Sequence, residues 1–354
     1  MLAQLGERNA GSVEVRGSTP LHSTIGQYFK QTKGLNVINK NLVIAPPPYN
    51  YIALFLTLHC NLACPYCINL NESSATRKSV MREHIEPEAW LDFISRLELR
   101  DENGQWREDI PLTLQGGEPT TYKGFYKLVN GIPDKFKLDL LTNFMFNVDE
   151  FIDKIPAAKF TRDAKYAAIR VSYHPGQNKI EDLIAKHHKM RDAGFYVGIY
   201  SVATPSNLAH IKEVQERCLK EGIDFRLKEY LGFDGAQWHG TYKYPEAISQ
   251  SVNRYCDCKT TELLIAPNGS VYRCHSDLYE SRTPVGSILD PSFEIKDIHR
   301  PCFVFGHCNP CDIKVKTNRF QEFGHTSVDI THIRDLSAQE ASALAQGDYG
   351  LGRA

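Results

Sequence analysis

The sequence lacks a long hydrophobic run, an apolar leader and an excess of charge of either sign. Its longest apolar stretch covers residues 51–58, whereas a membrane-spanning helix needs roughly 20 such residues. The opening residues, MLAQLGERNAGS, contain no apolar segment of the kind found in secretory signals. The formal net charge is −1, whereas nucleic-acid-binding proteins usually carry a basic excess. We therefore expect a cytoplasmic protein that binds neither membranes nor nucleic acid.

The composition is that of a folded protein. Hydrophobic residues make up 42% of the 354 residues and charged residues 23%, which is close to the average of soluble globular proteins. A disordered chain would be poorer in apolar residues. The length allows one large domain or two to three ordinary ones.

Cysteine is abundant for a chain without an export signal. Because disulfides are rare in the reducing cytosol, clustered cysteines there indicate metal or redox chemistry. Cys218 stands alone on the apolar face of a predicted helix, where we expect a core residue. The other nine form two groups: Cys60, Cys64 and Cys67, and then Cys256, Cys258, Cys274, Cys302, Cys308 and Cys311.

Short apolar segments alternate with predicted helices between residues 49 and 230. One helix is predicted at 87–99, where Pro87 suits the first turn. This alternation predicts an α/β fold with a parallel sheet and helical crossovers. Six units suit an open or partial barrel better than a doubly wound sheet, although the periodicity alone fits both. The predicted strands cover residues 51–58, 110–115, 137–141, 167–173, 195–202 and 223–230.

The remaining segments suggest a division of the chain around this core. Pro46, Pro47 and Pro48 mark a boundary because proline cannot donate hydrogen bonds to a sheet. Asn268-Gly269 predicts a hairpin turn within a small, cysteine-rich, metal-stabilised module. The predicted parts are a lead-in at 1–48, the core at 49–230, a linker at 231–254, the module at 255–316 and a C-terminal tail at 317–354 with a short helix at 338–345.

The first cysteine group, CNLACPYC, follows a predicted buried strand directly. The loop after such a strand lies at the edge of a parallel sheet where active sites form. Three thiolates are too few for a tetrahedral zinc site, but on a [4Fe–4S] cluster they leave one iron open to a small molecule. The alternatives are a zinc site completed by a remote residue such as His59, or three unconnected thiols.

A second motif ends the strand predicted at 110–115. It reads Gln115-Gly116-Gly117-Glu118-Pro119. Two glycines at a strand end allow the backbone to approach a ligand closely, and the alternative is an ordinary turn.

The two motifs together resemble those of the radical S-adenosylmethionine (radical SAM) superfamily. CxxxCxxC with an aromatic residue, here Tyr66, before the last cysteine is the cluster motif of that family, and GGEP follows it in the expected order. The resemblance covers residues 50–230 and implies a partial (β/α)6 TIM-like barrel.

The resemblance also implies the cofactors and their ligands. Cys60, Cys64 and Cys67 would hold a [4Fe–4S] cluster whose open iron binds S-adenosylmethionine. An electron from an external donor, such as flavodoxin or ferredoxin, would release a 5′-deoxyadenosyl radical that takes a hydrogen atom from the substrate. The residues implied in binding S-adenosylmethionine are Tyr66, Gly116, Gly117, Glu118 and Pro119, and in weaker matches Asn143 and Ser172.

The second cysteine group resembles the twitch or SPASM modules that follow many radical SAM barrels. Gly269 lies five positions before Cys274, and Cys308 and Cys311 form a CxxC. We expect one auxiliary [4Fe–4S] cluster, and a structural zinc ribbon is the alternative. The favoured ligands are Cys258, Cys274, Cys308 and Cys311, with Cys256 and Cys302 as substitutes or as ligands of an incomplete second site.

We predict a small-molecule substrate of the sugar, aminocyclitol or nucleoside type that undergoes oxidation, epimerisation or elimination. The segment before the barrel looks too short for the recognition domain that peptide modifiers often carry. The alternative within the family is modification of a ribosomally made peptide. A non-enzymatic zinc-binding interaction protein is a further alternative.

Strand alternation indicates residues that face the substrate. On the predicted strands, aliphatic side chains should face the helices, so Arg170, Arg226, Lys228 and Tyr230 should face the interior. We assign Lys228, Arg170 and Tyr230 to the catalytic set. We also expect at least one of the three cations, Arg170, Arg226 or Lys228, to bind an anionic group of the substrate. The alternative is that they pair only with internal carboxylates such as Asp139. Four histidines are further candidate ligands or bases, or ordinary surface and core residues: His174, His187, His239 and His275.

Overall fold

The computed structural model describes residues 41–67, 83–240, 242–248, 253–308 and 328–346. The chain separates into two units, Met1–Lys40 and Asn41–Ala354. All the described residues belong to the second unit. Of the predicted sites, Cys311 and part of the predicted tail lie outside the described residues.

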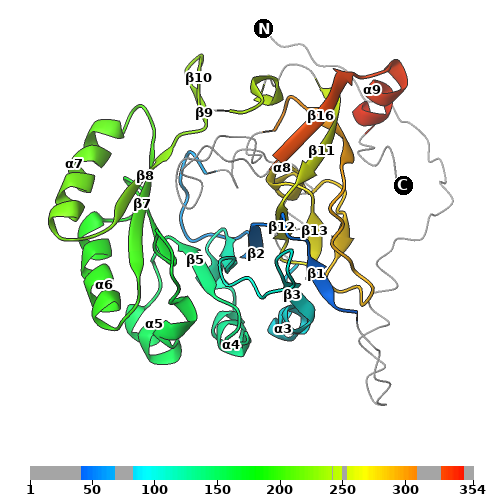
Figure 1. The fold of residues 1–354 in the computed structure, drawn as a ribbon. Helices are drawn as coiled ribbons and strands as arrows, with labels where there is room; N and C mark the ends of the chain where they lie inside the picture. The colour runs from blue at the N-terminus through cyan, green and yellow to red at the C-terminus, as the bar shows by residue number, and fades with distance from the viewer. Residues whose placement is uncertain (1–40, 68–82, 241, 249–252, 309–327, 347–354) are drawn as a thin grey trace, which may run out of the picture. The chain divides into compact units, whose positions relative to one another are not determined.

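A nine-stranded sheet forms the centre of this unit (Figure 1). Six of its strands follow one another in chain order and pair in parallel, each with the next. They coincide with the six predicted strands, so the α/β class is confirmed, and the partial barrel remains a prediction. These strands are β2 (Tyr51–Thr57), β4 (Leu112–Gly116), β5 (Leu138–Thr142), β6 (Ile169–Tyr173), β7 (Val197–Ala203) and β8 (Phe225–Glu229).

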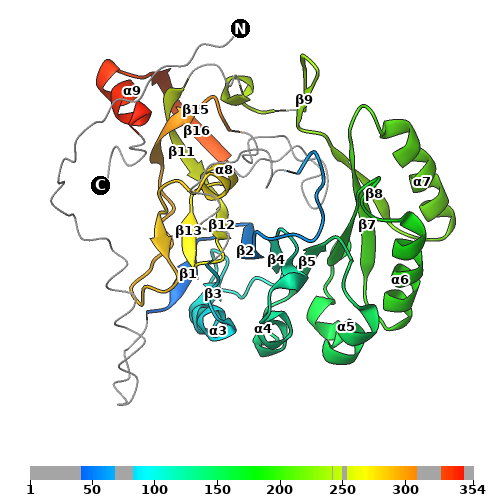
Figure 2. The same ribbon diagram turned by 180° about the vertical axis from the view of Figure 1, so that it is seen from behind.

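Helices between the strands cover one face of the sheet (Figures 1 and 2). Ile169 and Val171 of β6 lie in the same buried apolar cluster as Leu183 and Ile184 of the helix that follows. Since side chains alternate along a strand, Arg170 and Ser172 lie on the face away from the helices. The helices are α3 (Pro87–Arg96), α4 (Phe125–Gly131), α5 (Val148–Lys154), α6 (Ile180–Asp192) and α7 (Leu208–Lys220), with the 3₁₀ turns η1 (Pro119–Thr121) and η2 (Ala157–Phe160).

Helix α3 is shorter than the sequence predicts. Pro87 occupies its first turn as expected, but the helix ends at Arg96 and the chain becomes extended at Leu97. The next three residues form β3 (Leu97–Leu99), which pairs in parallel with β1 (Val43–Ala45). The apolar residues of β3 alternate with Glu98, so the strand pairing replaces the last helical turn.

The C-terminal part adds to the central sheet. The predicted hairpin is present, with Gly269 in the left-handed conformation at φ 83°. Its first strand pairs in parallel with β2, so the hairpin extends the central sheet. The bounds of the predicted module remain a proposal. The added strands and helix are β12 (Glu262–Ile265), β13 (Ser270–Tyr272), β14 (Gly286–Ser287) and α8 (His275–Tyr279).

A second, antiparallel sheet contains three strands in the order β15-β11-β16. Helix α9 (Ala338–Ala345) coincides with the predicted helix and begins at Ser337, whose side chain accepts a hydrogen bond from the Glu340 N–H. The other elements are β11 (Arg254–Thr260), β15 (Arg300–Phe305), β16 (Val328–Asp335), the hairpin of β9 (Gly232–Asp234) and β10 (Gln237–His239), and the turn η3 (Pro245–Ile248).

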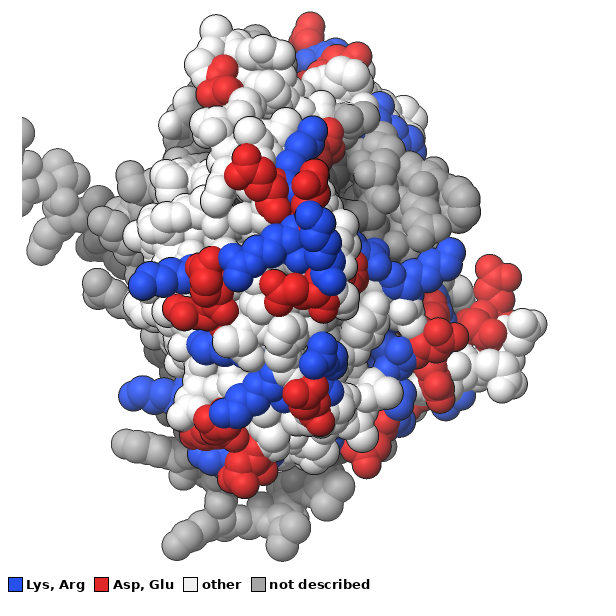
Figure 3. Space-filling model, turned by 90° about the vertical axis from the view of Figure 1, so that its left-hand side faces the viewer, with Lys and Arg blue, Asp and Glu red and all other residues white. Residues whose placement is uncertain are grey.

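Charges of both signs are interleaved on the outer face of α6 and α7 (Figure 3). Arg217 pairs with Glu181 at 2.7 Å and with Glu221 at 3.4 Å. Exposed pairs of this kind contribute little to stability. Within the described ranges, no helix has both the length and the apolar character needed to cross a membrane.

Candidate active site

The first cysteine group forms a loop directly after β2. Within it, the Cys67 N–H donates to the Cys64 carbonyl at 3.0 Å, and the Leu62 N–H donates to the Cys60 sulfur at 3.4 Å. Burial, followed by the charges of Cys67 and Cys60, raises the pKa of the Cys64 thiol to about 11. The three thiols are therefore close enough to interact electrostatically.

The two glycines of the second motif pack against the chain that leads into this loop. A Cβ atom on Gly116 would lie 1.9 Å from the Thr57 carbonyl oxygen, and one on Gly117 would lie 2.2 Å from that of His59. The Gly117 N–H donates to the Thr57 carbonyl and the Glu118 N–H to the His59 carbonyl, both at 2.8 Å. Any contact of this segment with an ammonium group would therefore use carbonyl oxygens, because an ammonium group only donates.

Glu118 joins the end of β4 to the end of β5. Its fully buried carboxylate accepts hydrogen bonds from the Thr120 hydroxyl at 2.6 Å, the Thr142 hydroxyl at 2.9 Å and the Asn143 N–H at 2.7 Å. Burial raises the pKa of this carboxyl, and the donors oppose that rise. The Glu118 side chain is thus a connector between strand ends, a role that sequence reasoning did not assign to it.

Asn143 extends this connection to the cysteine loop. Its amide nitrogen donates to the Asn61 side-chain oxygen at 2.7 Å and lies 3.6 Å from the Cys60 sulfur. Its side-chain oxygen accepts from the Met145 N–H at 3.0 Å. Asn143 therefore lies beside the first cysteine, at the strand end where the sequence predicts a cofactor contact.

The loop after β6 holds the cysteine loop from the other side. Tyr66 Oη and His174 Nδ1 are hydrogen-bonded at 3.0 Å, and Gln177 accepts from the Ala63 N–H at 3.2 Å. Asn178 donates to the carbonyls of Ser172 at 2.9 Å and Asn143 at 3.3 Å.

Sequence reasoning missed Gln177 and Asn178 because neither belongs to a motif. Their polar side chains in the turn after a predicted strand were the only available signal. Ser172 takes part through its carbonyl, which is a different contact from the predicted one.

The ends of four parallel strands thus meet around a CxxxCxxC loop, with a GG-Glu segment bonded to the residues before it. These features agree with the resemblance of the two motifs to those of the radical S-adenosylmethionine superfamily. That resemblance rests on the motif residues and on their contacts at the strand ends.

The donor set of the loop suits the cluster of a radical SAM enzyme. Three thiols and no fourth cysteine belong to it, which matches a cluster with one open iron. Among the described residues, no three Cys, His, Asp or Glu side chains converge closely enough as they stand to hold a metal ion. The thiols would therefore have to turn toward a bound cluster.

The comparisons with known proteins concern structures alone. No family model matches the sequence, and no curated protein matches it. The solved structure of Streptococcus suis SuiB bound to precursor peptide SuiA overlaps with a TM-score of 0.41 and 14% identity, over 81% of this chain and 72% of that one. Native anSMEcpe with bound AdoMet and Kp18Cys peptide overlaps with a TM-score of 0.43 and 14% identity, over 68% of this chain and 78% of that one.

The expectation of a small-molecule substrate is wrong on these findings. The two structures described above are named for complexes with peptides, SuiA in one case and Kp18Cys in the other. The length of the lead-in, on which the expectation rested, does not decide the substrate.

The cations predicted to face the substrate differ in their surroundings. Arg170 is buried and pairs with Asp139 at 3.1 Å, a carboxylate that Arg162 also binds through two nitrogens. Arg226 pairs with Asp224 at 2.9 Å. Arg170 thus pairs with an internal carboxylate and Arg226 with a partly exposed one, and their contact with a substrate stays a prediction.

Lys228 has different surroundings from the two arginines. It is half-buried, and its ammonium lies 5.4 Å from the centre of the Tyr200 ring. Tyr230, at the end of the same segment, has its ring 6.0 Å from that of His239 in β10. Lys228 and Tyr230 therefore stay in the proposed substrate-facing set.

Five cysteines of the second group lie together in one buried cluster. Cys256 of β11 stands opposite Cys302 of β15. A hydrogen bond between their thiols raises the pKa of Cys256 and lowers that of Cys302. Sequence reasoning placed these two outside the favoured set, yet they share the cluster with its other members: Cys258, Cys274 and Cys308.

The other singled-out residues have ordinary environments. Cys218 is buried in the apolar core, as predicted. His187 is hydrogen-bonded to the Val197 carbonyl at 3.0 Å inside the protein. His275 lies 3.4 Å from the buried carboxylate of Glu262.

His174 predicts a pH dependence of stability. Burial, and to a lesser extent the charge of Lys228, lowers its pKa to about 4. A lowered pKa means that the unfolded chain binds the proton more readily, so stability should fall as pH falls from about 6.5 toward about 4. Urea unfolding between pH 7 and 4 should show a smaller loss of unfolding free energy in a His174→Phe variant than in the unsubstituted protein. An equal loss in both proteins would contradict this assignment.

Proposed function

We propose that this radical SAM enzyme modifies a peptide. The observation that carries the chemistry is the cysteine loop at the end of β2, bonded on one side to Gly117 and Glu118 and on the other to the loop after β6. When bound, the cluster and S-adenosylmethionine would supply a 5′-deoxyadenosyl radical that removes a hydrogen atom from the substrate.

The chain's own residues would position these groups. Cys60, Cys64 and Cys67 would hold the cluster, and Asn143 would fix the loop beside Cys60. Carbonyls of the segment 116–119 would accept from the amine of S-adenosylmethionine. Tyr66 and Ser172 would complete that site through their main chain.

A peptide substrate is the alternative that the sequence analysis gave to a small molecule. Aromatic side chains follow β8 in the chain: Trp238 lies in β10, and its ring is 5.7 Å from that of Tyr242, beyond the hairpin. Aromatic groups after Lys228 would suit an extended chain that carries an acidic group for Lys228. SuiB and anSMEcpe are each named for a complex with a peptide.

We also propose an auxiliary cluster in the C-terminal part. Its ligands would come from Cys258, Cys274, Cys308 and Cys311, with Cys256 and Cys302 close enough to substitute. Four thiolates suit either an iron–sulfur cluster or zinc.

Lys228→Met tests the substrate part of this proposal. The variant should cleave S-adenosylmethionine without substrate as fast as the unsubstituted enzyme, because Lys228 is not among the residues proposed to hold the cluster or S-adenosylmethionine. Its peptide-dependent turnover should fall at least about tenfold, as expected for one lost charge-assisted contact.

The assay uses short peptides encoded beside the gene, and mass spectrometry of the peptide together with 5′-deoxyadenosine release. Exposed Lys154 supplies the matched control, Lys154→Met. Release stimulated by small metabolites but by none of the peptides would contradict a peptide substrate.

A further inference from the structure

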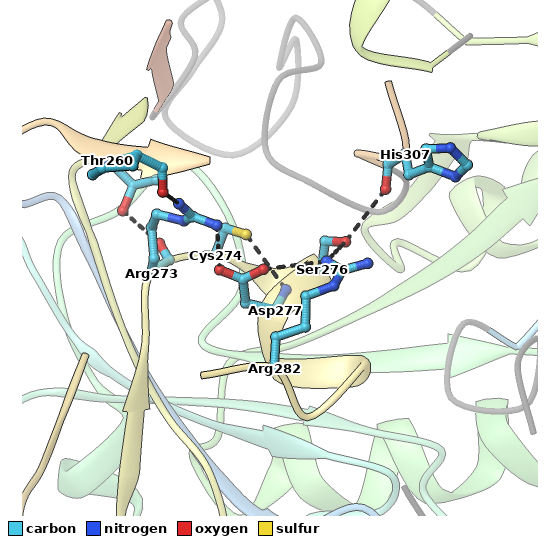
Figure 4. Close-up of polar contacts among 8 residues, drawn as sticks. Thr260, Arg273, Cys274, Ser276, Asp277, Arg282 and His307 are labelled. Atoms are coloured by element: carbon cyan, nitrogen blue, oxygen red, sulfur yellow. Dashed lines mark hydrogen bonds and ion pairs between the residues drawn. The ribbon is translucent and has the colours of Figure 1, made fainter. Parts of the chain in front are cut away.

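A buried ionic network lies among the cysteines of the C-terminal part (Figure 4). Arg273 pairs with Asp277 at 2.6 Å, and their side chains are only 11% and 5% exposed. Arg282 reaches the other carboxylate oxygen of Asp277 at 3.2 Å. None of these three residues belongs to a motif that the proposed function uses.

The network contacts the first two cysteine-bearing segments. The Thr260 hydroxyl, two residues after Cys258, donates to the Arg273 carbonyl at 2.8 Å. The Asp277 N–H donates to the Cys274 sulfur at 3.4 Å. Strand β11 and the start of α8 are therefore joined through Arg273 and Asp277.

It contacts the other two segments in the same way. The Arg273 guanidinium donates to the carbonyl of Pro301, the residue before Cys302, at 2.5 Å. Ser276, which accepts from Arg282 at 2.8 Å, donates to the carbonyl of His307 at 3.4 Å, next to Cys308. All four segments that bring cysteines to the buried cluster thus contact this set of residues, two through its main chain and two through its side chains.

Arg273 brings a positive charge beside the cysteines. Its side chain is only 11% exposed, and Cys274 follows it directly in the chain. A buried cation is stabilised by nearby anions, so thiolates that bind a metal beside it would be favoured.

We propose that Arg273, held by Asp277, is a positioning residue that gathers the four cysteine-bearing segments and balances the negative charge of their thiolates in a metal centre. The inference rests on the proposed auxiliary centre. It also explains why that centre would lie beside β13 and α8. The Arg273 guanidinium is already oriented there by hydrogen bonds to the Pro301 carbonyl and to Asp277.

The test uses the full chain with Cys60, Cys64 and Cys67 replaced by alanine, so that only the C-terminal centre can bind metal. After anaerobic reconstitution with iron and sulfide, or with zinc alone, a chelator titration measures retention of the metal. Arg273→Met should retain it roughly 10–100-fold less tightly, the usual cost of losing a partner just outside the ligands. Arg273→Lys keeps the positive charge, so its metal affinity should lie between those of the Arg273 protein and of Arg273→Met.

Two further measurements separate this role from a merely structural one. In the iron-loaded protein, Arg273→Met should lower the midpoint potential, because the reduced centre loses a neighbouring positive charge, and Arg273→Lys should restore most of it. Arg254→Gln, which removes an arginine paired with Asp335 on the same sheet, is the matched control and should change neither quantity. Urea unfolding checks that each variant is folded.

The outcomes distinguish the two proposals. If the chain with Arg273 intact binds no metal, the auxiliary centre itself is wrong, and this inference falls with it. If that chain binds metal and Arg273→Met binds it equally tightly with an unchanged potential, the role of Arg273 is overturned while the centre stands.

Discussion

A Cys64→Ala variant should lose reductive cleavage of S-adenosylmethionine completely. Cys64 is the central thiol of the loop after β2 and its most buried member. Removing it leaves two thiolates, too few to hold a [4Fe–4S] cluster that keeps one iron open. The measurement is 5′-deoxyadenosine released by the anaerobically reconstituted, dithionite-reduced protein, together with its iron content.

Cys218→Ala is the matched control for that experiment. Cys218 is also a buried thiol, but it lies in the apolar core on α7, away from both cysteine groups. Its replacement should lower stability slightly and leave cleavage unchanged. Substantial cleavage by Cys64→Ala would rule out the assignment of the loop as the catalytic centre.

Gly116→Ala should damage the site strongly although it adds a single methyl group. The new Cβ would lie 1.9 Å from the Thr57 carbonyl oxygen, and the backbone has a φ of +143°. Neither the carbonyl nor the strand pairing between β2 and β4 can move cheaply. We expect a loss of about 2–4 kcal/mol in unfolding free energy and a displaced cysteine loop that binds S-adenosylmethionine poorly.

Gly222→Ala separates the clash from backbone strain. Gly222 also has a positive φ, +73°, but an added Cβ there would meet no atom within 4 Å. It should cost only about 1 kcal/mol and should leave cofactor binding intact. Urea unfolding and equilibrium binding of S-adenosylmethionine compare the two variants. Equal effects of the two variants would mean that the close approach of Gly116 to β2 matters neither for stability nor for binding of S-adenosylmethionine.

The strands of the core could be predicted because their signal is local. Short apolar runs between turn residues mark β2 to β8 without any knowledge of the partners, and the position of the cysteine loop follows from the strand before it. The end of α3 could not be predicted, because β3 exists only through its pairing with β1, more than forty residues earlier in the chain.

The contacts that shape the site are long-range and therefore hidden in the sequence. Gln177 binds Ala63 across 114 positions, and Asn143 binds Asn61 across 82. The same holds for the second cysteine group, where the register of β11 against β15 brings Cys256 opposite Cys302. Motifs in the sequence identify candidate residues. The register of the strands determines which of those residues lie next to one another.

The pairing of β12 with β2 has a consequence for synthesis of the chain. Tyr51 pairs with Glu262, so one edge of the strand that carries the catalytic loop finds its neighbour only after about two hundred further residues have left the ribosome. Until then one edge of β2, a strand that is apolar from Ile52 to Leu56, has unpaired backbone N–H and C=O groups, the kind of edge that promotes aggregation and recruits chaperones. A nascent chain stopped before β12 should therefore be insoluble even though every residue of the catalytic loop has been made.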